Sequence, residues 1–433
     1  MRILFACLVL GFILAGCYKS HRLVEPAPVP TDDAGEMPTP DGGITEDGGT
    51  IEPDGGVITP DAGTFVLEAY EMRPSTILIA GGDVWHNVAT YRVPADESLA
   101  SIEVTLDGDA ADIQEVAIAA DGYVLGTGRF PSGTDTATRI PLDEPFVTPR
   151  DATRTFMVWV KIPSVVSNAS SGGVRDGFPM SGDSFRVGVH AVERYVGSVL
   201  VTSDFDPVMG NEFVIRKSRP TFTRQMLANF MFSNDDMEVD LYRFQVTADA
   251  AGSIGLRAVR FSVGITSATG RVCNVRIRRG STEIPRTEYF LRDGRMGGSE
   301  SCWSMLSGTI LIYFFNEETV TGSGNEYTVF GTPGGFVAGD SIVTTLVGDD
   351  ATDGFVTGYI GGLGGFGQSI DTSPWGSPSG TCNGDVGASL IWSDLSEIPH
   401  LAANPCGDAS RGSRDWTNGY LIEDLTQTQT LTR

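Results

Sequence analysis

Short apolar runs that alternate with polar residues are the feature that most limits how this chain can fold. In 154–162, Phe156, Val158 and Val160 take every second position. Side chains on a β-strand point alternately to its two faces, so this spacing predicts strands with one buried face. Further runs of this kind lie at 76–80, 88–93, 102–106, 185–189, 242–246 and 259–265. We therefore expect an all-β fold.

The composition agrees with short strands and narrows the function. Among 433 residues there are 54 Gly and 23 Pro, which divide a chain into strands and turns. The best helix candidate is the short segment 224–232. A formal net charge of -25 repels phosphate backbones, so nucleic acid is not an expected partner. Only four His residues are available as general bases, so an enzyme needs specific evidence.

The first sixteen residues have the features of an export signal. Arg2 precedes an apolar stretch of about 12 residues, shorter than the roughly 20 that cross a membrane as a helix. Leu14-Ala-Gly-Cys17 follows and closely resembles the lipobox of bacterial lipoproteins. That resemblance implies that 1–16 is a signal peptide and that Cys17 carries a lipid; the alternative is an ordinary secretory signal. Tyr18, where an Asp would favour retention in the inner membrane, favours the outer membrane.

Residues 17–64 differ in composition from the rest of the chain. Pro, Gly, Asp, Glu and Thr predominate, and Asp-Gly pairs recur at Asp41, Asp47 and Asp54. Such a segment buries too little apolar surface to offset its ordering entropy, so we expect a disordered acidic tether. At about 3.1 Å per residue, it would reach on the order of 100 Å from a membrane.

Three pairs of similar segments indicate an internal duplication. Segment 89–96 resembles 240–249, Phe146-Val-Thr148 resembles Thr319-Val-Thr321, and 182–187 resembles 339–344. We expect two related β domains at 65–217 and 218–348, and a Gly- and Trp-rich extension at 349–433 that packs on the second domain. Short antiparallel strands in domains of this size favour immunoglobulin-like sandwiches, with a barrel as the alternative.

The cysteines predict disulfides in the folded part. Cys7 leaves with the signal peptide and Cys17 takes the lipid, so four remain: Cys273, Cys302, Cys382 and Cys406. An even set in an exported chain favours two disulfides. We favour the pairs 273–302 and 382–406 because nearer partners close smaller loops, while the two other pairings stay open. No Cys-x-x-Cys spacing is present, so no metal is expected.

Two motifs that can carry chemistry are better explained by turns. Gly362-Leu-Gly-Gly-Phe-Gly367 has the glycine spacing of a dinucleotide-binding loop, but prolines follow where a helix should begin. Gly182-Asp-Ser184 and Gly339-Asp-Ser341 resemble the nucleophile block of some lipases. Their matching places in the duplicated domains indicate a turn that enters a strand.

One functional alternative is a secreted hydrolase. It would need His86, His190 or His400 to lie beside a Ser or Cys and a carboxylate. Acidic residues are so abundant that no carboxylate pair can be singled out for glycoside hydrolysis. We therefore assign no catalytic residue and no cofactor.

Arginines are concentrated in one part of an otherwise acidic chain. Nine of them lie between residues 257 and 295. On a strand through Val275 and Ile277, the apolar residues would face the core while Arg276 and Arg278 face solvent. With Arg279 they form a candidate face for an anionic ligand, such as an envelope polysaccharide. The ordinary alternative is a set of solvated arginines.

Aromatic residues mark the C-terminal region: Trp375, Trp392, Trp416 and Tyr420 lie among Gly, Ser, Asn and Asp. The three tryptophans are candidates for stacking on sugar rings, although packing in a hydrophobic cluster is the favoured interpretation. Ile391-Trp-Ser-Asp-Leu-Ser396, then His400, then Asp415-Trp-Thr-Asn-Gly-Tyr420 resembles the closing signature of exported β-sandwich proteins of uncultivated bacteria, notably the candidate phyla radiation. Lys217-Ser-Arg-Pro-Thr221 and the segment 244–256 resemble further motifs of that group.

The resemblance implies a cell-surface location and a β-sandwich fold, and no defined activity comes with it. We therefore expect a lipid-anchored, extracytoplasmic and non-enzymatic protein with a structural, adhesive or display role in the bacterial envelope. A glycan-binding surface module is the main alternative. The expected partners of the protein are the membrane, through the N-terminal lipid, and envelope polysaccharide or other surface proteins. The sequence leaves the oligomeric state open.

Overall fold

The part of the chain that the structure describes is built from strands. The computed structural model describes residues 65–70, 77–131, 136–165, 179–232, 237–293, 302–303, 307–349, 389–396, 415–423 and 425–433. In these ranges the one helical element is η1 (Ala110–Asp112), a single 3-10 turn. Accordingly, none of the described residues form a helix with the length and hydrophobicity to cross a bilayer. The all-β prediction is confirmed.

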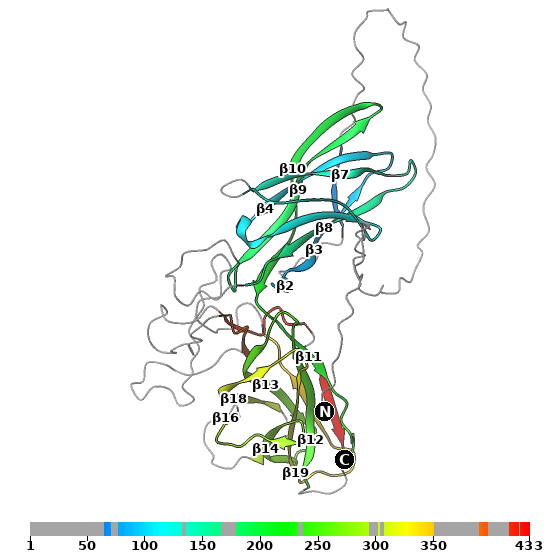
Figure 1. Cartoon of the computed structure of the whole chain (residues 1–433). Helices are drawn as coiled ribbons and strands as arrows, with labels where there is room; N and C mark the ends of the chain where they lie inside the picture. Colours follow the sequence, from blue (N-terminus) through cyan, green and yellow to red (C-terminus); the bar gives the residue numbers. More distant parts are fainter. Residues whose placement is uncertain are drawn as a thin grey trace, which may run out of the picture.

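The first sandwich pairs two five-stranded sheets (Figure 1). One sheet contains, in spatial order, β1 (Glu68–Tyr70), β3 (Val84–Val93), β8 (Arg154–Ile162), β5 (Glu115–Ala120) and β6 (Tyr123–Gly128). The other contains β2 (Ile77–Ala80), β10 (Val199–Arg216), β9 (Ser184–Val196), β4 (Ser98–Asp107) and β7 (Ala137–Val147). Buried side chains from both sheets form one hydrophobic cluster, so the sheets pack face to face.

The second sandwich is built in the same way. One sheet contains β11 (Pro220–Arg224), β12 (Val239–Ala248), β19 (Asn325–Gly334), β14 (Arg271–Arg279) and β15 (Thr282–Glu283), with β17 (Cys302–Trp303) paired to β14. The other contains β16 (Tyr289–Asp293), β18 (Ser307–Val320), β13 (Ile254–Ile265), β20 (Ser341–Leu346) and β23 (Thr428–Thr432). In that sheet β21 (Leu390–Ser393) also pairs with β13, and β22 (Trp416–Asn418) pairs with β21.

The two sandwiches share one topology. The order β3-β8-β5 in the first corresponds to β12-β19-β14 in the second, and β10-β9-β4-β7 corresponds to β23-β20-β13-β18. The three pairs of similar sequence segments occupy equivalent places, on β3 and β12, at the ends of β7 and β18, and at the starts of β9 and β20. This is the strand arrangement of an immunoglobulin-like sandwich.

The alternating pattern places its apolar residues in the core as expected. On β8, Phe156, Val158, Val160 and Ile162 are all fully buried, whereas Met157, Trp159 and Lys161 between them are half-buried. The last strand of the second sandwich, β23, lies within the predicted extension 349–433. It pairs with β20 and completes that sheet.

The helix expected at 224–232 is not formed, so that prediction was wrong. β11 ends at Arg224, and the chain then runs beside β23, with an isolated parallel bridge between Met231 and Thr432. The Thr432 N–H donates to Phe230 O at 2.9 Å and the Phe232 N–H donates to Thr432 O at 3.2 Å. These bonds to a neighbouring strand take the place of bonds within a helical turn.

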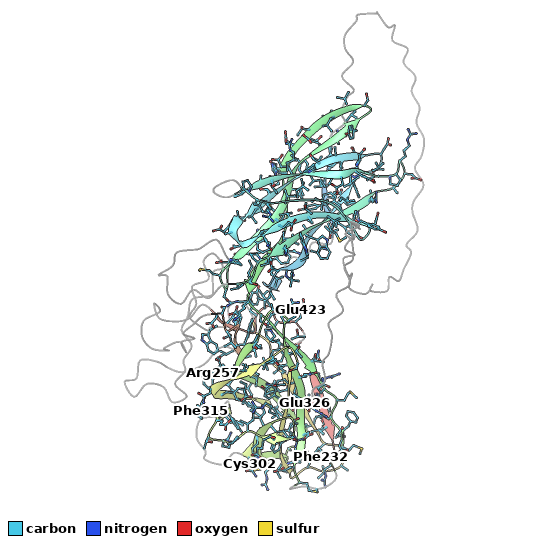
Figure 2. The ribbon with its side chains drawn as sticks, in the orientation of Figure 1. Phe232, Arg257, Cys302, Phe315, Glu326 and Glu423 are labelled. Atoms are coloured by element: carbon cyan, nitrogen blue, oxygen red, sulfur yellow. A yellow bond between two sulfur atoms is a disulfide. The ribbon has the colours of Figure 1, made fainter. Side chains whose placement is uncertain are left out.

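A disulfide joins Cys273 on β14 to Cys302 on β17, which is the first of the two favoured pairs (Figure 2). Several sequence predictions concern residues outside the described ranges. These are the lipid site Cys17, the tether 17–64, the glycine motif 362–367, Trp375, His400, and the pair Cys382 and Cys406.

Candidate functional site at the junction of the two sandwiches

The chain passes from the first sandwich to the second through a linker of three residues, 217–219, which is hydrogen-bonded to both sandwiches. After β10, Ser218 Oγ donates to Gly252 O of the second sandwich at 3.0 Å. Arg219 Nη1 donates to Leu78 O of the first sandwich at 2.9 Å, although Arg219 itself leads into β11. The linker is therefore short and hydrogen-bonded, unlike the polar, flexible linkers that usually separate domains.

The two sandwiches also approach closely beside this linker. A Cβ atom added to Gly82, in the turn after β2, would lie 2.8 Å from the Cβ of Ala251 in the second sandwich. Gly82 has a φ of 133°, which side chains rarely adopt. A glycine is thus required at this contact both by its backbone conformation and by the proximity of the neighbouring sandwich.

A buried carboxylate, Asp394, holds the crossing from the other side. Its Oδ2 accepts hydrogen bonds from Ser181 Oγ and from the Lys217 N–H, both at 2.7 Å. Its Oδ1 accepts from Ser396 Oγ at 2.6 Å and from the Ser396 N–H at 3.2 Å. Asp394 follows β21 in the second sandwich, whereas Ser181 precedes β9 in the first, so one side chain binds both sandwiches.

Charges of both signs are buried around Asp394. Arg216, the last residue of β10, is 1% exposed, and its Nη1 donates to Ser181 Oγ at 2.9 Å. Lys217 Nζ donates to Leu395 O at 3.0 Å. Burial raises the pKa of Asp394; the guanidinium of Arg216 opposes this shift and the neighbouring Asp415 adds to it. A buried charge is tolerated only with such partners, which makes the geometry of this cluster specific.

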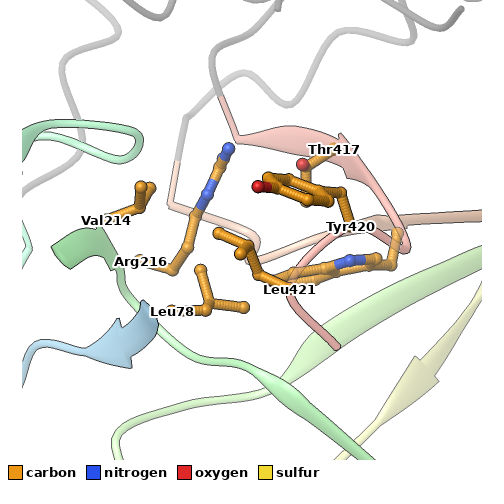
Figure 3. A pocket seen from close by; sticks show the side chains of 7 residues that line it. Leu78, Val214, Arg216, Thr417, Tyr420 and Leu421 are labelled. Atoms are coloured by element: carbon orange, nitrogen blue, oxygen red, sulfur yellow. The ribbon is translucent and has the colours of Figure 1, made fainter. Parts of the chain in front are cut away.

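A small pocket of about 230 Å³, part of it open to solvent, lies beside this cluster (Figure 3). Figure 3 shows the guanidinium of Arg216 next to the ring of Tyr420 and the hydroxyl of Thr417. The remaining lining residues are apolar: Leu78, Val214, Trp392 and Leu421. Leu78 and Val214 belong to the first sandwich, yet they are part of the hydrophobic cluster of the second. The cores of the two sandwiches therefore meet at this point.

Taken together, these contacts make a rigid joint, which we define as Ser181, Arg216, Lys217, Asp394 and Ser396 with the apolar residues that line the pocket. It combines a short linker, a hydrogen-bonded buried charge cluster and a shared apolar core. Such a joint fixes the relative orientation of two sandwiches, because movement would expose charges whose partners lie on opposite sides.

The joint includes residues from segments that the sequence analysis linked only through the resemblance to exported β-sandwich proteins. Lys217 lies in Lys217-Ser-Arg-Pro-Thr221 and Asp394 lies in Ile391-Trp-Ser-Asp-Leu-Ser396, while Ala251 of the nearby contact with Gly82 lies in 244–256. Ser181 and Arg216 were not singled out in advance. The one available signal was an Asp within an apolar, Trp-containing strand end, a place where an acidic residue is expected only when it has buried partners.

Two of the three predicted sugar-stacking tryptophans are not accessible. Trp392 is fully buried and Trp416 is 3% exposed, and Trp392 Nε1 donates to Asn418 O at 2.8 Å. Neither ring offers a face to a sugar at the surface, so the stacking hypothesis was wrong for these two residues. Their role is packing, which was the favoured interpretation.

The arginine face carries its own compensating charges. Val275 and Ile277 are buried beneath it as expected. Arg276 pairs with Glu238 and Glu283, Arg278 pairs with Asp240 at 2.5 Å, and Arg279 pairs with Glu318 at 2.7 Å. Because each guanidinium has a carboxylate beside it, this face is a weaker candidate for an anionic ligand than its sequence indicates.

The histidines within the described residues do not form a hydrolytic site. The Nε2 atom of His86 lies 2.9 Å from Ala80 O, and that of His190 lies 3.3 Å from a carboxylate oxygen of Glu103. Ser101 Oγ donates to Glu193 at 2.7 Å, and no serine in this part of the chain is hydrogen-bonded to a histidine. Nor do the described residues contain a metal-ligating cluster of His, Cys, Asp and Glu.

The Gly-Asp-Ser motifs are matching turns, as their duplication indicates. The Met180 N–H donates to Asp183 Oδ2 and the Val337 N–H donates to Asp340 Oδ2, each at 2.8 Å. Gly182 and Gly339 have φ values of 86° and 93°. In both sandwiches the aspartate closes a turn and the serine begins a strand.

Comparisons with known proteins give no family for the chain. No protein-family model matches the sequence, and no curated protein matches it.

Among solved structures, the chain is similar to the C-terminal domain of the antigen I/II polypeptide BspA of Streptococcus agalactiae, with 8% identity, a TM-score of 0.20, and coverage of 65% of this chain and 94% of that one. It is also similar to the CupB6 tip adhesin of Pseudomonas aeruginosa (9% identity, TM-score 0.20, 66% and 92%) and to the collagen adhesin of S. aureus (10%, 0.14, 65% and 85%). TM-scores this low carry no argument about function.

Proposed function

We propose that this protein is an exported, lipid-anchored component of the bacterial cell surface whose two sandwiches form a stiff unit with an adhesive or structural role. The observation that carries the proposal is the rigid joint. An acidic side chain from the second sandwich binds the first through Ser181 and the Lys217 N–H, and both sandwiches contribute to one apolar cluster. A surface protein needs such stiffness to hold a binding end away from its attachment.

The proposed anchor and tether complete this mechanism. The lipid at Cys17 supplies attachment and residues 17–64 supply reach. The first residue of the described fold, Phe65, packs on Phe205 of β10 in the first sandwich. The second sandwich is therefore connected to the anchor only through the first, and the joint keeps it extended. In a two-membrane cell we place the lipid in the outer membrane.

The end of the second sandwich that is far from the joint carries exposed apolar side chains. Met226, Phe230, Met231 and Val337 are each more than half exposed. Phe230 and Met231 lie beside Thr432, and Figure 2 shows the adjoining Phe232 away from the joint. Large exposed apolar side chains are often contact surfaces for partners. Other surface proteins are the partners that this end would fit best; envelope polysaccharide stays the alternative.

Labelling with a fatty-acid analogue tests the anchor. In a bacterial host that processes lipoproteins, we expect the wild-type chain to incorporate the label and to be digested by protease added to intact cells. The Cys17→Ala variant should lose the label, whereas Cys7→Ala should keep it, because Cys7 lies in the part that is removed. An unlabelled wild-type chain, or labelling that survives Cys17→Ala, would contradict the proposed anchor.

Adherence of whole cells tests the role. Cells that display the chain should bind to a neighbouring-cell layer more strongly than cells without it. Replacing Phe230 and Met231 by serine should reduce binding, while Val66→Ser and Val147→Ser, two exposed apolar residues of the first sandwich, should not. Equal binding by displaying and non-displaying cells would leave only the structural role.

A further inference from the structure

Over most of its length, the outer edge of β10 is not paired with any strand in the described part of the chain. β10 has 18 residues, Val199–Arg216. On one side it pairs with β9 along most of this range. On the other side, the one described strand is β2, which pairs in parallel with residues 213–216 only. In the described part of the chain, therefore, no strand pairs with the outer edge from Val199 to Glu212; Tyr91 and Phe65 contact Val208 and Phe205, and 199–203 precede these contacts.

The second sandwich shows that this edge can be covered. Its equivalent strand, β23, is short, and the chain after β11 runs alongside it. Arg224 donates to Thr428 O, Gln429 donates to Gln225 O, and Met231 bridges to Thr432. In the first sandwich the described residues that pair with this edge are those of β2, and the β9-β10 hairpin extends away from β2 (Figure 1).

The exposed edge divides into a protected part and an unprotected part. Asp204, Asp206 and Pro207, together with a bulge between Asp204 and Val208, occupy its middle. Charges, proline and bulges are the devices that keep edge strands from pairing. The stretch before them, Val199-Leu-Val-Thr-Ser203, has no charge and no proline and is rich in β-branched residues, the composition of a segment that adds to another strand.

Apolar side chains surround this stretch. Val199 is 51% exposed and Leu200 is 49% exposed, and Tyr195, the partner of Leu200 across the hairpin, is 41% exposed. Large apolar residues at a hairpin end gain nothing in a monomer, since they leave apolar surface in water.

We propose that residues 199–203 of β10 pair in antiparallel fashion with the same residues of a second copy of this chain, joining the two β2-β10-β9-β4-β7 sheets. An edge that meets itself about a two-fold axis offers matching donors and acceptors, which is the geometry of an isologous dimer. This goes beyond the proposed surface role and does not depend on the lipid.

The charges of the hairpin select this partner and this register. With Val201 on the axis, Leu200 faces Thr202 of the partner and Val199 faces Ser203, and every facing side chain is neutral. Asp204 then lies opposite the partner's hairpin turn, so the acidic residues of the two copies do not oppose one another. A slip that brought the Asp204 residues together would place like charges opposite one another. In a chain with a net charge of -25, repulsion between two copies is smallest where the facing stretch is neutral.

Two double variants test the pairing and its register. Leu200 and Thr202 are exposed, so their replacement leaves the core intact. Leu200→Glu with Thr202→Glu sets glutamates against glutamates across the axis, and we expect about tenfold weaker self-association. Leu200→Glu with Thr202→Lys sets the introduced glutamate of each copy against the introduced lysine of the other, and we expect association at least as strong as in the wild type.

Sedimentation equilibrium of the full chain without its lipid (Cys17→Ala), over a range of concentrations, supplies the readout. Thermal unfolding of both variants checks that each is folded. The proposal is supported if the wild type dimerises, the Glu/Glu variant is weakened and the Glu/Lys variant is not. It is overturned if the wild type stays monomeric at the highest concentration, if both variants behave alike, or if the wild type binds another protein through this edge but not itself. Because the lipid is absent, none of these results bears on the anchor.

Discussion

At the scale of single residues, Asp394 is the side chain on which the joint depends most. It accepts hydrogen bonds from Ser181, Lys217 and Ser396 and is fully buried. We predict that Asp394→Ala lowers the free energy of unfolding by about 3 to 5 kcal/mol, because it leaves the donors of Ser181, Lys217 and Ser396 without their acceptor and removes the negative charge that stabilises buried Arg216. Denaturant unfolding measures this, with exposed Asp107→Ala as the control that should change nothing measurable. Equal midpoints for the two variants would remove Asp394 from its central place.

The second residue-scale prediction concerns pH. Burial lowers the pKa of His86 from its ordinary value of 6.5, although a hydrogen bond to Ala80 O acts in the opposite direction. The unfolded chain then binds a proton that the folded chain does not, so the stability contributed by neutral His86 is present above pH 6.5 and is lost as the pH falls toward the lowered pKa.

His86→Gln keeps a donor for Ala80 O but removes the titration. We expect the free energy of unfolding of the wild type to fall more steeply than that of this variant between about pH 7 and pH 5, a range in which histidine is the main titrating side chain. Parallel curves for the two proteins over this range would show that His86 does not contribute.

At the scale of elements, the disulfide is what holds β17 to the edge of its sheet. Cys273 and Cys302 are 29 residues apart, and β17 contains just two residues, Cys302 and Trp303. Closing a loop of this length contributes about 3.6 kcal/mol in the chain-entropy account. We predict that the double variant Cys273→Ser, Cys302→Ser unfolds at a lower denaturant concentration than the wild type.

Reduction of the wild type provides the comparison for this variant. A reducing agent should bring its midpoint down to that of the double variant or below. Any further decrease when the double variant itself is reduced reports the proposed second pair, Cys382 and Cys406. If the double variant and the oxidised wild type share one midpoint, β17 is held by other contacts.

Sequence alternation predicted most elements because it reports a local property, the burial of one face of a strand. It correctly placed β8, β12 and β13, whose apolar residues are buried at every second position. It failed at 224–232, where the backbone bonds lie with β23, about 200 residues further along the chain. β23 also pairs with a strand far from it in the sequence, since Ser341 of β20 lies opposite Thr432, so alternation could not show that it completes that sheet.

At the scale of the whole molecule, the joint was the part least accessible from sequence. Its polar atoms come from the approach to β9, the end of β10 and the segment after β21. No local period links Ser181, Arg216 and Asp394, because the contacts exist only once both sandwiches have folded. In a sequence rich in acidic residues, one more aspartate or arginine gives no sign that it is buried. Asp394 and Arg216 stabilise the joint only because the fold brings them close together.

The joint makes a prediction about distance. With spin labels at exposed Asp151 in the first sandwich and Ser281 in the second, pulsed electron resonance should give one narrow distribution for the wild type, because the Asp394 cluster and the Leu78 and Val214 contacts fix the orientation. Asp394→Ala should broaden it, since the second sandwich then loses the acceptor that binds Ser181 of the first sandwich and the Lys217 N–H of the linker.

Asp349→Asn is the matched control for this measurement. Asp349 is half-buried, and it accepts from the backbone N–H groups of Ser389, Leu390 and Gly419, all in the second sandwich. Its replacement should lower stability while leaving the distance distribution narrow, because it binds nothing in the first sandwich. A broad distribution in the wild type would mean that the two sandwiches move independently, and the stiffness on which the proposed display depends would then be absent.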